Sequence, residues 1–162
     1  MNPIPTPTSL IIRITKHLPL VEKFLLTALA IGVILTLLRM DTTVTRLTLL
    51  GLGITFFLYA YRPVEIPLQE NEKFGFPELL GLMIVPKVLW ISCAVSAVGI
   101  AFYLFRNEGY KQLLFIGGSS VGIGTFLLVI LLLNGVKHIK IITPVLLRAV
   151  PLLLADTYLF LK

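Results

Sequence analysis

The sequence is poor in the side chains that most enzymes use. Its 162 residues include one cysteine, two histidines and only 14% charged residues. Cys93 therefore has no partner for an intramolecular disulfide and no companion thiols for a metal site. His17 and His138 lie in different segments, and the chain has no motif for nucleophilic, phosphate-binding or metalloprotease chemistry. These absences predict no catalytic residue, no cofactor and no metal, and they favour a non-enzymatic protein.

Apolar residues are abundant instead. They make up 57% of the chain, against roughly 45 to 50% in a typical soluble protein, and the mean hydropathy is +0.96. Such a chain predicts a single all-α integral membrane domain with the lipid bilayer as its main partner. The net charge of +6 is better explained by membrane-flanking loops than by nucleic-acid binding.

Four apolar runs bounded by charged residues are predicted to cross the membrane. They extend over residues 20–38, 44–61, 87–105 and 113–133. A spanning helix needs about 20 mainly apolar residues. The short connections between the first two runs and between the last two predict two helical hairpins, over 20–62 and 87–134. The hairpins share an order of features that could reflect an internal duplication, although two unrelated hairpins under the same topological rules would also share it.

Two further segments are predicted to lie on the membrane or to enter it partway. Within the N-terminal segment, 1–19, residues 9–18 form an amphipathic pattern, and we expect an interfacial helix that ends at Pro19. The connection between the hairpins, 63–86, is rich in proline, glycine and acids. Within it, residues 76–85 are apolar but too short to cross, so a surface or re-entrant helix ending at Pro86 is expected.

The C-terminal segment, 135–162, is basic at first and then apolar. Its apolar part is long enough to cross, but it contains Arg148, Asp156 and Pro151. Each central charge costs roughly 2.5 to 3.5 kcal/mol on insertion scales. We therefore expect a helix that breaks near Pro151 and packs at the cytoplasmic side, with a fifth span as the alternative.

The distribution of Lys and Arg predicts the orientation. In the four-span topology, a cytoplasmic N-terminus leaves ten of the 14 basic residues on the inner side and four on the outer side. This bias favours a multi-pass protein of a bacterial-type cell inner membrane with both termini in the cytoplasm.

Two groups of polar residues are candidate sites. The first is a polar cluster near the inner interface, and the alternative for its members is separate snorkelling charges with one structural ion pair. Its members are Glu78, Lys87, Arg148 and Asp156. The second is a basic patch that would contact anionic lipid headgroups. It consists of Lys137, His138 and Lys140.

Small and aromatic residues complete the pattern. Small residues let membrane helices approach closely, and we expect them mainly at contacts within the chain, with a homodimer contact through Gly118 and Gly122 as the alternative. The glycines selected for helix packing are Gly32, Gly118, Gly122 and Gly124. The aromatic residues expected at the membrane interfaces are Trp90, Tyr59, Tyr61, Tyr103 and Tyr110.

These features favour a non-enzymatic accessory or scaffolding subunit, with a membrane-protein partner or a second copy of the chain. The alternative is an oligomeric small transporter or channel for a lipid or an apolar solute. It would need polar space near Ser92, Ser96, Ser119 or Thr125. The four expected spans have no ionisable residue near their centres, which argues against a proton-coupled carrier. A lipid-modifying enzyme would require the polar cluster to converge within hydrogen-bond range.

Overall fold

A computed structural model describes residues 7–40, 42–62, 79–133 and 139–162, and it describes side chains from Lys16 in the first range and from Thr143 in the last. The described chain contains five helices that are long and apolar enough to cross a membrane. The elements are α1 (Pro7–Leu37), α2 (Thr43–Ala60), the π-helical turn η1 (Leu80–Ile84), α4 (Val85–Phe105), α5 (Tyr110–Leu133) and α6 (Ile139–Leu161). The expected all-α membrane fold is therefore confirmed, and α6 is the fifth candidate span.

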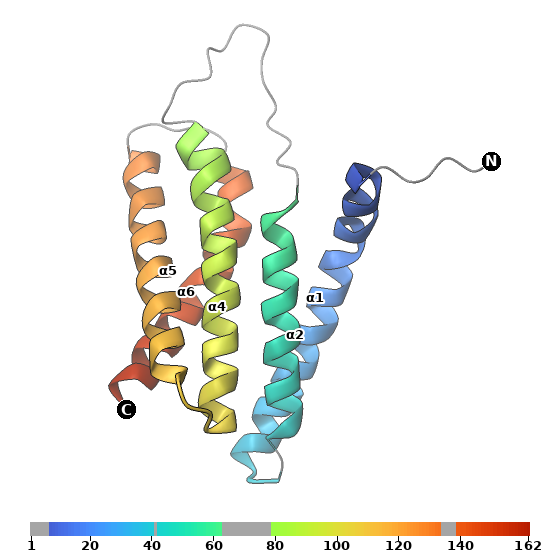
Figure 1. The fold of residues 1–162 in the computed structure, drawn as a ribbon, viewed down its shortest axis with the longest axis vertical. Coiled ribbons are helices and arrows are strands. Elements are labelled where there is room, and N and C mark those ends of the chain that lie inside the picture. The colour runs from blue at the N-terminus through green and yellow to red at the C-terminus, as the bar shows by residue number, and fades with distance from the viewer. Residues whose placement is uncertain (1–6, 41, 63–78, 134–138) are drawn as a thin grey trace, which may run out of the picture.

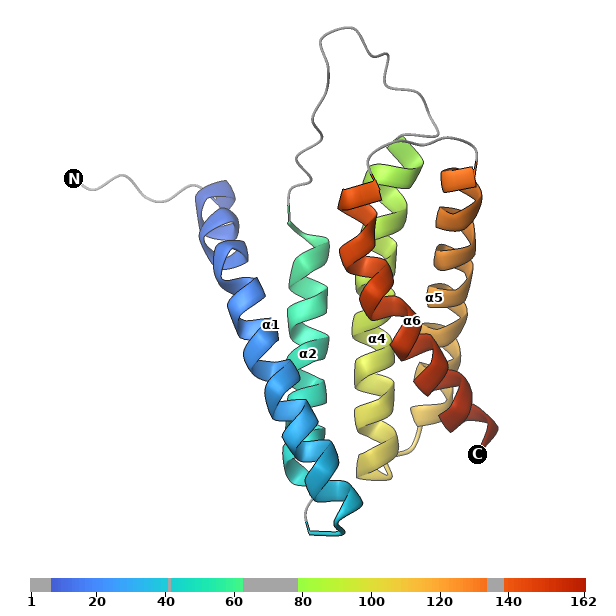
Figure 2. The ribbon, with the colours of Figure 1, turned by 180° about the vertical axis from the view of Figure 1, so that it is seen from behind.

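The helices form two layers (Figures 1 and 2). In one layer α4 packs between α2 and α5, and in the other α1 packs on α2 while α6 packs across α4 and α5. One end of the bundle holds the beginnings of α1, α4 and α6, and we call it the N-terminal end. The turns after α1 and α4 lie at the other end, the turn end, and α6 runs toward it (Figure 1). The C-terminus thus lies away from the beginning of α1, which differs from the four-span topology.

Two prolines that were expected to end or break helices lie inside them. α1 continues through Pro19, so no separate interfacial helix ends there, and α6 continues through Pro151 without a break. Each proline removes one backbone hydrogen bond. A break within hydrocarbon would leave several backbone groups without partners, which costs more. The apolar residues on both sides of each proline therefore keep these helices continuous.

The segment before α4 also differs from the expected separate helix. From Leu79 onward the chain is helical and joins α4 directly, whereas residues 76–78 lie outside the described residues. In η1 the backbone N–H of Val85 donates to the carbonyl of Leu80, five residues earlier. This wider turn places Pro86 in the first turn of α4, where the missing N–H costs least.

Glycine brings α4 and α5 into close contact. A Cβ atom on Gly117 would lie 2.8 Å from the backbone nitrogen of Ser96, and one on Gly124 would lie 2.7 Å from Cδ2 of Leu89. The two contacts are seven residues apart on both helices, the spacing of antiparallel helices that pack at a shallow angle. The absence of two side chains therefore sets the distance between these helices.

The glycines selected from the sequence all face other helices of the same chain. A Cβ atom on Gly32 would lie 2.9 Å from the backbone nitrogen of Thr45 on α2. One on Gly118 would lie 3.2 Å from Cβ of Asp156 on α6, and one on Gly122 would meet a leucine of α6 at 3.8 Å. The Gly118 and Gly122 face, considered for a homodimer, is thus covered by α6.

The two hairpin turns share an unusual backbone conformation. Arg39 follows α1 with a φ angle of 56°, and Arg106 follows α4 with a φ angle of 54°. Both angles lie in the left-handed region, where helices usually end with glycine or asparagine. The similarity between the hairpins therefore extends to the geometry of their turns.

Candidate functional site

A buried acid toward the N-terminal end of the bundle binds two side chains from other helices. Glu22 of α1 is 2% exposed. Arg148 of α6 binds both of its carboxylate oxygens, with Nε donating to Oε1 and Nη2 donating to Oε2 at 2.9 Å. The hydroxyl of Tyr59 on α2 also donates to Oε2, at 2.9 Å. Such charge-assisted, bidentate bonds are the strongest hydrogen bonds that side chains make.

An aromatic side chain completes this group. The Arg148 guanidinium lies over the ring of Trp90 on α4, 5.6 Å from its centroid. Trp90 in turn stacks on Tyr59, with the ring centroids 4.5 Å apart. We refer to Glu22, Tyr59, Trp90 and Arg148 as the Glu22 cluster. It joins four helices at the N-terminal end of the bundle, and it links α1 to α6, which do not pack along each other in the described chain.

A second acid lies deeper, between α4, α5 and α6. Asp156 of α6 is 1% exposed and Ser96 of α4 is fully buried. Ser96 is the polar side chain that interacts with the carboxylate. Nevertheless, neither Asp156 oxygen nor the Ser96 hydroxyl has a hydrogen-bond partner of normal geometry among the described residues. Buried polar groups are nearly always paired, so this arrangement stands out.

Two adjacent glycines of α5 create the space for these side chains. A Cβ atom on Gly117 would lie 2.6 Å from the Ser96 hydroxyl oxygen, and one on Gly118 would lie 3.5 Å from Oδ2 of Asp156. At roughly 1.5 Å per residue, Ser96 lies about 24 Å from Leu80 and about 14 Å from Phe105 along the helix axis. We call Ser96, Gly117, Gly118 and Asp156 the Asp156 site, and it is well inside the apolar part of the bundle.

Other hydroxyls on α4 and α5 lie farther toward the N-terminal end. Thr125 has a buried hydroxyl without a hydrogen-bond partner in the described chain. Ser92 donates to the carbonyl of Val88 instead. Ser119, a residue selected from the sequence, is exposed and donates to Ile116. Among the hydroxyls of α4 and α5, those of Thr125 and Ser96 are therefore buried without a hydrogen-bond partner in the described chain.

No protein-family model, curated protein or solved structure matches the chain. The two sites must therefore be interpreted from their own chemistry. In the part of the chain that the structure describes, no three His, Cys, Asp or Glu side chains come together as a set of metal ligands.

The structure separates the described members of the predicted polar cluster. Arg148 belongs to the Glu22 cluster, and Asp156, eight residues further along α6, faces Ser96 instead. Lys87 is half-buried, and no hydrogen bond or ion pair joins it to either residue in the described chain. Glu78 lies outside the described residues.

The predicted basic patch stays a prediction. Lys137 and His138 lie outside the described residues, and Lys140 is in the first turn of α6 with its side chain not described. Trp90 and Tyr59, which were predicted as interfacial aromatics, pack in the Glu22 cluster, and their depth in the membrane stays a prediction.

Glu22 is the site residue that the sequence pattern missed. It stands at the edge of an apolar run next to Lys23, where it resembles an ordinary flanking charge. A signal was nevertheless present, because Arg148 in the C-terminal apolar segment requires an acidic partner. Glu22 is the acid closest to the apolar part of the expected spans.

Proposed function

We propose that the protein is a small membrane transporter or channel subunit in which Asp156 takes up and releases a proton. The observation that supports this proposal is the Asp156 carboxylate, buried inside the bundle without a hydrogen-bond donor of normal geometry among the described residues. An ionisable residue within membrane-spanning helices is a functional site by default, because it is expensive to keep there.

The environment of Asp156 favours a binding role over a structural one. A carboxylate that faces only the Ser96 hydroxyl, in a medium of low polarity, recovers little of the hydration that it loses. A proton or a cation bound to one oxygen removes that charge. A purely structural position against Gly118 would be filled equally well by a small apolar side chain. The sequence pattern argued against a proton-coupled carrier because the four expected spans have no central ionisable group, and α6 supplies one.

In the same proposal, the Glu22 cluster closes the N-terminal end of the bundle. It links α1 to α6 through the ion pair of Glu22 with Arg148. When two helices are joined mainly by one ion pair, a change in that pair moves them apart or together. Asp156 lies about 12 Å further along the axis of α6 than Arg148.

Asp156 should react with a hydrophobic carbodiimide, and the D156N variant should not. The carboxylic acid adds across the carbodiimide, and the adduct rearranges to a stable N-acylurea, so the acid must be protonated. Intact and peptide mass spectrometry of the full chain in lipid nanodiscs measures the reaction.

In vesicles with an internal pH dye and an imposed potential, the wild-type chain should move protons faster than D156N.

The matched control for this experiment is E108Q. Glu108 is exposed in the turn between α4 and α5, so the variant should keep both the reaction at Asp156 and the proton movement. A reactive Asp156 without faster proton movement than protein-free vesicles contradicts translocation. An Asp156 that stays unreactive over the whole pH range contradicts the proton site itself.

A second candidate function is the accessory or scaffolding subunit expected from composition. In the apolar span of α1, only 11% of residues are buried within the chain, against 50% in α2. A helix with so little covered surface has room for another membrane protein. Native mass spectrometry of the chain extracted with its lipids distinguishes the two candidates. A stoichiometric foreign subunit supports the accessory role, and a homo-oligomer without one supports transport.

The membrane orientation is part of this proposal. We propose that the N-terminal end of the bundle faces the cytoplasm of a bacterial-type inner membrane. With α6 crossing, Lys162 joins the turn end, and nine basic residues remain at or near the N-terminal end against five at the turn end. In a C93A background, a cysteine in K162C should react with a membrane-impermeant maleimide added outside intact cells. Reaction only after the cells are opened would reverse the orientation.

A further inference from the structure

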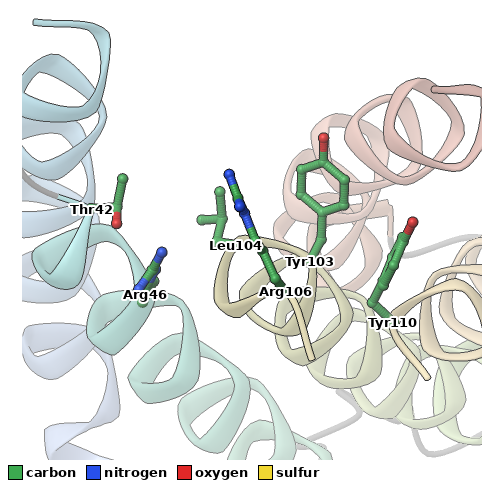
Figure 3. A pocket seen from close by; sticks show the side chains of 6 residues that line it. All are labelled: Thr42, Arg46, Tyr103, Leu104, Arg106 and Tyr110. Atoms are coloured by element: carbon green, nitrogen blue, oxygen red, sulfur yellow. The ribbon is translucent and has the colours of Figure 1, made fainter. Parts of the chain in front are cut away.

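A pocket of about 470 Å³ lies at the turn end of the bundle, away from both sites described above. Figure 3 shows the side chains that line it, with Arg46 of α2 on one side and residues from the end of α4 and the beginning of α5 on the other. The lining residues are Thr42, Arg46, Tyr103, Leu104, Arg106 and Tyr110. Two arginines, a threonine and two tyrosines thus line one space.

Arg46 lines this pocket and also has a buried N–H without an acceptor among the described residues. Its guanidinium lies over the ring of Phe105, 5.1 Å from the centroid. Its Nε is buried and has no hydrogen-bond partner among the described residues. A buried guanidinium N–H without an acceptor is costly. An anion in the pocket would stabilise the positive charge of this guanidinium.

Arg106 adds a second positive charge from the opposite side. It follows α4 in the left-handed conformation, with φ at 54°, and such conformations tend to occur at functional sites. Glu108, two residues later, is exposed and does not line the pocket. Glu108 therefore does not neutralise the positive charge of the pocket.

The position of the pocket narrows the class of ligand further. Thr42 precedes α2 and Tyr110 begins α5, so two helix N-termini, each with a partial positive charge, lie at the pocket. The rings of Tyr103 and Tyr110 pack edge to face, 5.3 Å apart. Tyrosines of this kind lie at the depth of the lipid headgroups. A site with positive charge at that depth fits a phosphate that is attached to an apolar body.

We propose that this pocket binds the phosphate of an anionic phospholipid headgroup, with a soluble phosphate as a second source of the same chemistry. Arg46 and Arg106 bind the phosphate oxygens, and the Thr42, Tyr103 and Tyr110 hydroxyls donate to them. The volume is sufficient for a headgroup. The proposal is independent of Asp156 and of the basic patch expected at the other end of the bundle.

The test uses the full chain in nanodiscs of phosphatidylcholine with an increasing fraction of phosphatidylglycerol, and bound lipids are counted by native mass spectrometry after extraction. A parallel titration with inorganic phosphate in neutral detergent tests the soluble source. The wild-type chain should retain phosphatidylglycerol over phosphatidylcholine. The R46Q/R106Q variant should bind it at least about tenfold more weakly, because it loses charge-assisted hydrogen bonds.

The matched control is R39Q/K111Q, which removes two exposed charges at the same end of the bundle without altering the pocket lining. It should retain the lipid as the wild-type chain does. Equal losses in both double variants would show diffuse surface attraction and overturn the proposal. A wild-type chain that neither prefers phosphatidylglycerol nor binds phosphate would also overturn the proposal.

Phosphate binding that depends on Arg46 and Arg106, without lipid retention, would assign the pocket to a soluble ligand. If R46Q/R106Q does not fold, R106Q alone changes only an exposed turn residue and should weaken binding in the same direction.

Discussion

Replacing Glu22 by leucine should destabilise the bundle by about 3 kcal/mol or more. The substitution leaves the Arg148 guanidinium, whose side chain is 26% exposed, without its carboxylate partner. Breaking a buried ion pair by removing one partner typically costs about 3 to 5 kcal/mol, because the remaining charge is desolvated and unpaired. Unfolding of the purified chain in mixed detergent micelles, followed by the Trp90 fluorescence, measures the loss.

The double variant E22L/R148L separates the ion pair from the packing. Removing both charges leaves no unpaired ion, so the double variant should be more stable than either E22L or R148L alone. If the loss of stability in the double variant equals the sum of the losses in the two single variants, the two residues do not act as a pair.

The Y59F variant tests the second hydrogen bond to Glu22. It removes only the hydroxyl that donates to Glu22, and it should cost about 1.5 kcal/mol, whereas Y61F, at an exposed position, should cost nothing measurable.

The hairpins could be predicted because the bilayer imposes one length and one polarity on any helix that crosses it. The runs that end near Arg39, Arg62 and Arg106 have that length and are bounded by charge, and α1, α2 and α4 follow them. The predicted helix end at Pro19 and the predicted break near Pro151 were wrong, because the prediction used the cost of proline in a helix surrounded by water. In hydrocarbon the cost of ending a helix is larger than the cost of continuing through proline.

The sites were less predictable because each depends on contacts between distant segments. Arg148 and Asp156 stood out as charges in an apolar segment, but nothing local shows that one binds Glu22 and that the other faces Ser96. The sequence distance between Glu22 and Arg148 is most of the chain, so only the packing of four helices brings them together. Likewise, Arg46 and Arg106 appear as ordinary flanking charges until α2 and α4 place them around one pocket.

The G117L variant should lose about 3 kcal/mol of stability and should separate α4 from α5. A Cβ atom at Gly117 would lie 2.6 Å from the Ser96 hydroxyl oxygen and 2.8 Å from the Ser96 backbone nitrogen. A side-chain rotation relieves the first contact but not the second, so the helices themselves must move. Overpacking of this kind typically costs about 1 to 3 kcal/mol, and more where backbone is involved. Thermal unfolding in detergent measures the loss.

G122L is the matched control on the same helix. A Cβ atom at Gly122 would meet only a leucine methyl of α6, at 3.8 Å, which is ordinary contact and involves no backbone, so a leucine there should cost less stability than one at Gly117. Because α5 also packs on α6, a general intolerance of α5 to larger residues would destabilise both variants alike and contradict this account. The close approach at Gly117 also determines where Ser96 lies relative to Asp156. If displacement of α4 removes the hydroxyl from the carboxylate, G117L should also change the carbodiimide reactivity of Asp156, while G122L should leave it unchanged.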